Sequence, residues 1–269
     1  MRGGGVRATR TVRPPLAVAV LGGMGIAFFL LPLGALLART PWRRLPGLLA
    51  TEVVADALRL SLAASLSATA LGLLLGVPLA WLLARGDFPG RGLVRGVVTL
   101  PLVLPPVVGG ALLLFALGRR GVVGGALEQA TGIVLPFSLA GVVVAVTFVS
   151  LPFLVLTVEG ALRGLDARYE AAAATLGAGR WTVFRRVTLP MVAPSLVSGT
   201  VLTWARAFGE FGATLTFAGN LPGHTRTLPL AVFVALESDR DTALAISLLM
   251  VGVSLAVLLL LRDRWWRAP

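Results

Sequence analysis

Two charged residues interrupt an apolar run in the C-terminal third of the chain, and together they could handle an anion. Arg206 and Glu210 are four residues apart, so on a helix their side chains share one face and can pair. Ionisable groups inside an apolar helix that crosses a membrane are energetically costly, and they usually face a charged partner or a water-filled cavity. Arg206 could attract an oxyanion, whereas Glu210 would repel one and is expected to orient Arg206 or to pair across a subunit interface. The sequence leaves open a structural ion pair and an element of a pathway.

Small residues lie beside this pair. Gly209 and Gly212 bracket Glu210 and would permit close helix approach. Packing explains each glycine alone, and the two together also suit a place where two copies meet. The candidate pathway or gate residues are Arg206, Gly209, Glu210, Phe211, Gly212 and Thr214.

Most other site chemistry is excluded by composition. The chain has no Cys and a single His, His224, so thiolate metal sites, Cys nucleophiles and His clusters are ruled out. It has no Lys, and a phosphate-binding Walker A loop needs one, so this chain does not hydrolyse ATP by that route. The carboxylates are scattered rather than clustered, unlike an enzyme site. We therefore expect no catalytic residue, no metal site and no cofactor bound by this chain.

A second group of candidate residues lies in segment 159–190, between two apolar runs. Residues 170–176 are alanine-rich and predict a short helix, and the glycines in 177–179 predict its end. A second short helix is expected to run to about Val187. Pro190 is then expected to open the next apolar helix, where its missing N–H costs nothing.

The surface of this predicted helix–turn–helix suits docking. The first helix presents small Ala side chains, and the second carries Trp181 and Phe184 three residues apart on one side. A helix face of small Ala side chains next to two protruding aromatic side chains could bind in a groove on a partner protein. The alternative is an ordinary amphipathic linker helix.

The elements that position these residues are predicted to cross a membrane. The chain of 269 residues is 57% hydrophobic and only 13% charged, with a mean hydropathy of +0.89, whereas about 25% of residues are charged in a soluble chain. A spanning helix needs about 20 mostly apolar residues. Six stretches qualify: 16–37, 58–84, 94–117, 134–158, 191–214 and 242–261.

Charge placement predicts the orientation. With the N-terminus inside, 15 of the 24 arginines fall in the cytoplasmic tails and inner loops. The chain then divides into a cytoplasmic tail (1–15), a first transmembrane helix (16–38), a five-span core (58–261) with its inner loop (159–190), and a second cytoplasmic tail (262–269). Because the arginines lie between apolar runs rather than on one basic face, we assign the net charge of +12 to topology and expect no nucleic-acid partner.

Prolines and one short apolar segment modify this simple pattern. The run 100–110 contains Pro101, Pro105 and Pro106 and should be strongly bent. Segment 228–237 is apolar but too short to span, so it predicts an interfacial or re-entrant helix. No internal repeat is visible, which weakens the case for a secondary transporter.

Segment 159–190 resembles the signature loop of bacterial ABC-importer permeases, Glu-Ala-Ala-x3-Gly-x9-Ile-x-Leu-Pro. Val187 stands for the family's Ile, and Ala171 falls where the family has Glu, with Glu170 one residue earlier. The residues that match at the family spacing are Ala172, Ala173, Gly177, Leu189 and Pro190. By this resemblance, the coupling loop that meets the ATPase is carried by Glu170, Ala171, Ala172, Ala173, Gly177, Trp181, Phe184, Leu189 and Pro190.

A second resemblance concerns the cargo. Segments 206–214, 217–220, 225–230 and 235–238, and the Pro-Pro-Val-Val-Gly-Gly run at 105–110, are similar to the molybdate and tungstate branch of these permeases. Sulfate permeases share the Gly-Glu-Phe-Gly core but differ downstream. Sulfate or another oxyanion therefore remains an alternative cargo, and an ion-coupled secondary carrier is a more distant alternative.

Together the two resemblances imply a fold and a set of partners. The fold is an all-α integral membrane protein of about six transmembrane helices, the type I ABC importer permease fold, in the bacterial inner membrane with both termini cytoplasmic. The implied partners are a second copy of the chain, a cytoplasmic ATPase dimer that binds ATP and Mg, an extracytoplasmic oxyanion-binding protein, and membrane lipid.

Overall fold

All elements of the described part of the chain are helices. The computed structural model describes the backbone of residues 15–265 and the side chains of residues 15–260. Both predicted tails therefore lie outside the described residues, apart from Pro15 and residues 262–265, which continue the last helix. The first six helices are α1 (Leu16–Arg39), α2 (Leu45–Leu49), α3 (Glu52–Arg85), α4 (Arg91–Val103), α5 (Pro106–Leu117) and α6 (Gly124–Thr131). The later elements are α7 (Leu139–Gly164), α8 (Arg168–Thr175), α9 (Arg180–Val183), the π-helical turn η1 (Phe184–Thr188), α10 (Leu189–Phe208), α11 (Gly212–Ala218), α12 (Leu228–Ser238) and α13 (Arg240–Trp265).

Five helices are long and apolar enough to cross a membrane. They are α1, α3, α7, α13 and the continuous helical segment Arg180–Phe208, which contains α9, η1 and α10. The third predicted span, 94–117, is broken into α4 and α5, as the predicted bend at 100–110 requires. Neither half alone reaches the ~30 Å of a bilayer core. The break falls at Pro105, because two consecutive prolines remove backbone donors there.

The seventh helix differs from its prediction at both ends. The span predicted at 134–158 is α7, which begins after Pro136 because Ser138 caps it, accepting a hydrogen bond from the N–H of Gly141 at 3.1 Å. At the other end α7 continues through Glu159 to Gly164. The inner loop predicted at 159–190 therefore begins within the last turns of α7, where Glu159 pairs with Arg163 at 3.0 Å.

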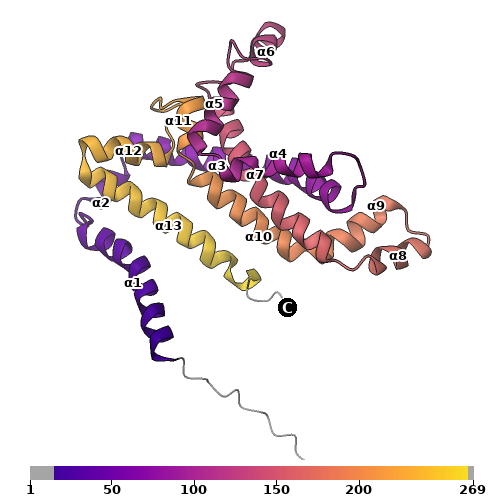
Figure 1. Ribbon diagram of the computed structural model, residues 1–269. Helices are drawn as coiled ribbons and strands as arrows, with labels where there is room; N and C mark the ends of the chain where they lie inside the picture. The colour runs from indigo at the N-terminus through magenta and orange to yellow at the C-terminus, as the bar shows by residue number, and fades with distance from the viewer. Residues whose placement is uncertain (1–14, 266–269) are drawn as a thin grey trace, which may run out of the picture.

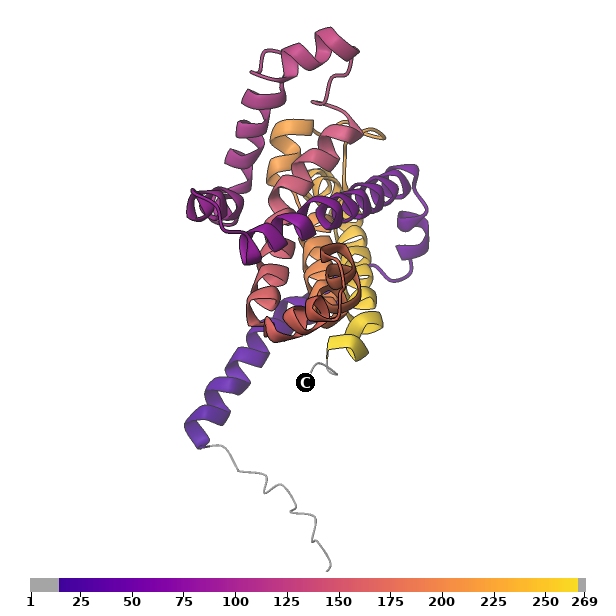
Figure 2. The same cartoon turned by 90° about the vertical axis from the view of Figure 1, so that its right-hand side faces the viewer.

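The centre of the molecule is a close-packed group of α3, α7 and α10. Small residues allow this approach: a Cβ atom on Gly76 would lie 2.9 Å from Leu151 of α7. Likewise, a Cβ atom on Gly199 of α10 would lie 3.2 Å from Leu154. Figures 1 and 2 show these helices at the core while α1 projects away from it. None of the residues of α1 is buried.

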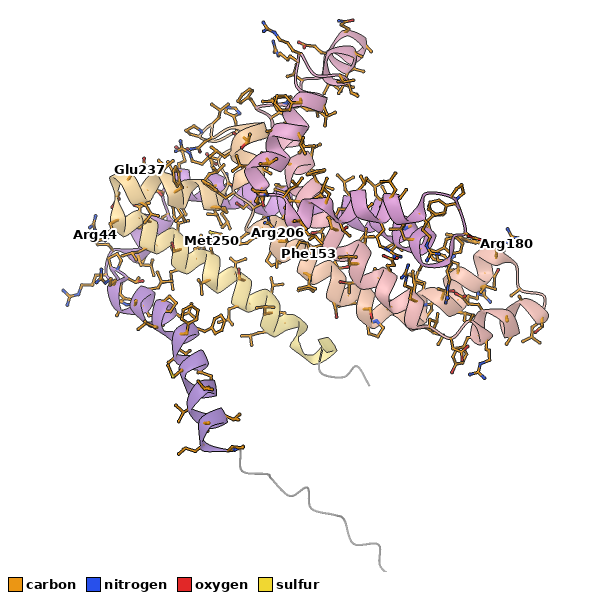
Figure 3. The ribbon with its side chains drawn as sticks, viewed as in Figure 1. Arg44, Phe153, Arg180, Arg206, Glu237 and Met250 are labelled. Atoms are coloured by element: carbon orange, nitrogen blue, oxygen red, sulfur yellow. The ribbon has the colours of Figure 1, made fainter. Side chains whose placement is uncertain are left out.

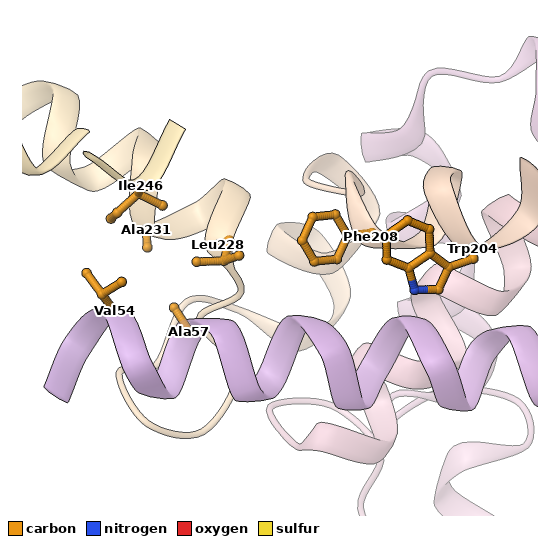
Figure 4. Close-up of a cluster of buried hydrophobic side chains, with 7 residues drawn as sticks. All are labelled: Val54, Ala57, Trp204, Phe208, Leu228, Ala231 and Ile246. Atoms are coloured by element: carbon orange, nitrogen blue, oxygen red, sulfur yellow. The ribbon is translucent and has the colours of Figure 1, made fainter. Parts of the chain in front are cut away.

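A hydrophobic cluster ties the short helix α12 to the long ones. Trp204 and Phe208 of α10 stack at 5.1 Å, and the backbone N–H of Leu228 donates to the hydroxyl of Ser61 at 2.7 Å. The prediction of a short helix at 228–237 is confirmed. Figure 4 shows the buried members of the cluster: Val54, Ala57, Trp204, Phe208, Leu228, Ala231 and Ile246.

Candidate functional site

The turn between α8 and α9 is built on Gly177. Its φ of +81° is left-handed, a region that glycine enters without the steric cost paid by other residues. The N–H of Gly177 donates to the carbonyl of Ala174 at 3.0 Å, and that of Ala178 to the carbonyl of Ala173 at 3.1 Å. This pair of bonds is a Schellman C-cap. The predicted glycine stop is confirmed, and nothing lies within 4 Å of a Cβ placed on Gly177.

The start of α8 is fixed by Asp166. Its carboxylate accepts hydrogen bonds from the N–H of Arg168 at 2.9 Å and from its Nε at 2.8 Å. The Arg168 side chain, and then its backbone N–H, hold the pKa of Asp166 below its usual range. The carboxylate thus stays charged at neutral pH and keeps these bonds.

The second helix of the loop does not stop before Pro190. It passes through the π-turn η1 directly into α10, so the prediction of a separate short helix ending near Val187 is wrong. A proline ring clashes with the carbonyl four residues earlier in a regular α-helix. The widened π-turn directly before Pro190 relieves this clash, so that the loop and α10 form one continuous helical rod.

Glu170 points inward and ties α8 to two other elements. Its carboxylate accepts a hydrogen bond from the hydroxyl of Thr188 at 2.7 Å and pairs with Arg85 at 3.4 Å. Thr188 belongs to η1 and Arg85 is the last residue of α3. Both charged side chains are about one-fifth exposed. Glu170 therefore fixes the position of the loop, while Ala171 beside it is exposed.

We expect Glu170→Ala to loosen α8 without unfolding the bundle. An eight-residue helix is marginal by itself, and the lost hydrogen bonds to a charged group are worth about 1.5–3 kcal/mol. Hydrogen exchange of the amides of 171–176 should accelerate roughly tenfold or more. The matched control is Glu128→Ala, which removes an ion pair of 3.8 Å on α6 and should leave that exchange unchanged.

A second charged cluster lies next to the first. Glu159 of α7 is almost completely buried and pairs with Arg95 of α4 and, at 3.0 Å, with Arg163. The Nε of Arg95 also donates to the same carboxylate at 3.1 Å. This cluster attaches α4 to α7 near the loop.

The exposed face of α8 carries two larger side chains beside the small Ala residues that the sequence predicted. Tyr169 and Leu176 lie on it with side chains 56% and 89% exposed, and Ala172 lies between them. The sequence analysis did not predict Leu176 as a contact residue, although a leucine within a charged loop was a signal that could have indicated it. Trp181 and Phe184 stack at 5.6 Å but lie beside Pro78 and Trp81 of α3. Their role in docking stays a prediction.

The charged pair predicted in the fifth span sits at a break in the helix. The prediction of a continuous span 191–214 is wrong, because α10 ends at Phe208 and α11 begins at Gly212. Glu210 is buried in the break. One of its oxygens pairs with Nη1 of Arg206 at 2.6 Å, and the other accepts a hydrogen bond from the N–H of Ala213 at 2.7 Å. Glu210 thus orients Arg206 and caps α11, and the pair is formed within one chain.

The residues around Glu210 divide into packing and pathway candidates. A Cβ on Gly212 would lie 3.1 Å from Pro106 and Val107, so Gly212 packs against α5 of the same chain. Thr214 is fully buried. Gly209 and Phe211 are in the break itself, and the ring of Phe211 lies 5.2 Å from that of Phe233. The side chain of Arg206 is 28% exposed, and Figure 3 shows it between Arg180 at one end and Glu237 at the other.

Five helices long and apolar enough to cross a membrane, with a polar helix–turn–helix between two of them, are typical of a multi-pass membrane protein. Among the described residues there is no group of three His, Asp or Glu that could hold a metal. The chain belongs to the family described as binding-protein-dependent transport system inner membrane component, whose sequence profile matches residues 72–268. It is therefore a permease subunit of an ABC importer, as the signature loop implied.

The chain is similar to permeases for molybdenum and for sulfate. The molybdenum transport system permease protein ModB of Mycobacterium bovis is 52% identical over 235 residues, 87% of this chain and 89% of that protein. ModB of Escherichia coli K12 is 46% identical over 210 residues, 78% of this chain and 92% of that protein. The sulfate transport system permease protein CysT of Escherichia coli K12 is 37% identical, over 85% of this chain and 84% of that protein.

A solved structure has the same fold. The bacterial ABC transporter involved in the import of the acidic polysaccharide alginate matches with a TM-score of 0.71 at 20% identity, covering 93% of this chain and 96% of that chain. The expected type I ABC importer permease fold is thereby confirmed.

Proposed function

We propose that this chain is the membrane permease of an ATP-driven importer of molybdate or tungstate. Two copies form the pore, an ATPase dimer that binds ATP and Mg docks on the loop between α7 and α10, and an extracytoplasmic protein delivers the oxyanion. Both termini are cytoplasmic, so the loop faces the ATPase. The observation that carries the cargo is the higher identity to molybdenum permeases, 52%, than to the sulfate permease, 37%.

The structure supports a simple mechanical coupling. The exposed face of α8 with Leu176 offers the ATPase a surface, and the turn at Gly177 connects this surface to α9. From Arg180 the helix runs without a break through η1 and α10 to Phe208. A force applied at α8 therefore reaches the break at Glu210 along one rod, and it changes the position of Arg206.

Arg206 is proposed as the cation that an oxyanion meets within the membrane. Its guanidinium suits two-point contact with a tetrahedral oxyanion. Its partial exposure leaves donors available while Glu210 holds the side chain in place. Because Glu210 is buried and occupied by Ala213 and Arg206, its negative charge is shielded from the pathway.

Uptake into proteoliposomes tests the function. The permease, ATPase subunit and binding protein are reconstituted with ATP, and uptake of labelled molybdate is measured with tungstate or sulfate as competitor. We expect uptake to need ATP and the ATPase, and to continue when ionophores collapse the ion gradient. Tungstate should inhibit uptake at far lower concentrations than sulfate. Uptake that persists without the ATPase but collapses with the ion gradient would favour the secondary carrier instead, and equal competition by sulfate would refute the cargo assignment.

A further inference from the structure

An apolar groove lies where the loop meets α3. It has a volume of about 420 Å³ and is lined by Pro78, Trp81 and Leu82 of α3 and by Arg180, Trp181 and Phe184. The rings of Trp181 and Phe184 stack at 27° and form one wall. The sequence predicts that Trp181 and Phe184 contact the ATPase, but the groove between these two rings and α3 has no assigned occupant.

The groove lies at the level where the membrane gives way to water. Trp81 is one turn before Arg85, the last residue of α3, and Asp87 follows two residues later. Tryptophan is enriched at this interface, because its ring is apolar and its N–H is polar. An apolar stripe on α3 leads away from the groove, since Leu74, Pro78 and Leu82 follow one another at four-residue spacing and both leucines are exposed.

The charge at the rim of the groove is positive. Arg180 is the one charged side chain among its lining residues, and it is exposed. Within residues 15–260 it makes no ion pair, and neither do the exposed Arg185 and Arg186. Glu170 and Arg180 both line an adjacent hollow, and the carboxylate of Glu170 is already engaged by Arg85 and Thr188. An apolar slot with an uncompensated arginine at its mouth complements a lipid with an anionic headgroup.

We propose that this groove binds one acyl chain of an anionic phospholipid whose headgroup phosphate pairs with Arg180. The aromatic wall and the α3 stripe hold the chain, and the guanidinium selects an anionic over a zwitterionic headgroup. The bound lipid bridges α3 and the rod that begins at Arg180. The assignment to the cytoplasmic leaflet rests on the orientation given in the proposed function. The lipid site itself does not depend on that orientation.

Photolabelling of the assembled transporter tests the site. The permease with its ATPase is placed in nanodiscs of phosphatidylcholine doped with either phosphatidylglycerol or phosphatidylcholine that carries a diazirine in one acyl chain. We expect the phosphatidylglycerol probe to label peptides containing 78–82 and 181–184, and the phosphatidylcholine probe to label them several-fold less. Labelling by phosphatidylglycerol should fall about tenfold in Arg180→Gln and also in Trp81→Ala. The matched control, Arg120→Gln, changes an exposed arginine between α5 and α6, away from α8 and α9 (Figure 1), and should have no effect.

Three outcomes would overturn the proposal. They are equal labelling by the two lipids, unchanged labelling in Arg180→Gln, and labelling that appears only after the ATPase is removed, which would mean that protein fills the groove. The assay needs neither ATP turnover nor oxyanion, so its failure is distinguishable from failure of the proposed transport function.

Discussion

Replacing Gly177 with valine is expected to lower ATP-driven oxyanion uptake at least tenfold while ATP hydrolysis by the complex continues. The left-handed φ of +81° costs an L residue about 1–2 kcal/mol, and a β-branched side chain is the least tolerated there. That cost lowers the population of the native angle between α8 and α9 by about tenfold relative to other angles. The ATPase would still bind the face of α8, but its movement would no longer be passed to the rod.

The matched control is Gly179→Val. Gly179 lies two residues further on, is equally open to solvent, and has an ordinary φ of −67°. A side chain fits there without strain, so uptake and ATP hydrolysis should both stay near the parent values. Uptake and hydrolysis in both variants are measured in the same proteoliposomes. Unimpaired uptake in Gly177→Val, or equal losses in the two variants, would contradict the role given to this turn.

Removing the charge of Arg206 is the second change with a large expected effect. Arg206→Gln should reduce the uptake rate at least tenfold, because the oxyanion loses the cation it meets within the membrane. The cap of α11 by Glu210 does not depend on Arg206, so the complex should still assemble.

Glu210→Ala should act differently. It leaves the N–H of Ala213 uncapped and Arg206 unpaired, and breaking a buried pair costs about 3–5 kcal/mol.

Two measurements on each variant separate these roles. Uptake and the thermal unfolding temperature of the purified permease are compared with those of Arg59→Gln, which alters an exposed pair with Asp56 at 3.7 Å. We expect Arg206→Gln to lose uptake with only a small drop in unfolding temperature, and Glu210→Ala to lose both. If uptake in Arg206→Gln fell only in proportion to its stability, the pair would be a structural ion pair, the alternative that the sequence left open.

The sequence predicted local features of the site well where one residue type carries the signal. The left-handed turn at Gly177 follows from a glycine after an alanine-rich helix, and the broken span follows from Pro105 and Pro106. Both depend on backbone chemistry within a few residues, which a single sequence displays.

Features that depend on distant partners were not predictable. Glu170 faces inward because Arg85, 85 residues earlier, ends α3 beside it. The break at Glu210 was missed because 191–214 is mostly apolar and long enough for one span, and Glu210 at four-residue spacing from Arg206 was interpreted as a helix-face residue. In the structure this carboxylate serves as a cap for α11, packed against α5 through Gly212. The π-turn before Pro190 was also missed, because the hydrophobic periodicity of the sequence does not show that the loop helix continues into α10.

The central claim is that an ATPase grips the exposed face of α8, and site-specific crosslinking tests it most directly. The chain has no native Cys, so a single thiol can carry a short photocrosslinker. Leu176→Cys places it at the C-cap of α8, and Val122→Cys places it at an equally exposed site, 90% against 89%, beside α6. In the assembled transporter we expect Leu176→Cys to crosslink to the ATPase subunit and Val122→Cys not to do so. Crosslinking of the ATPase from Val122→Cys, or from neither position, would contradict the account.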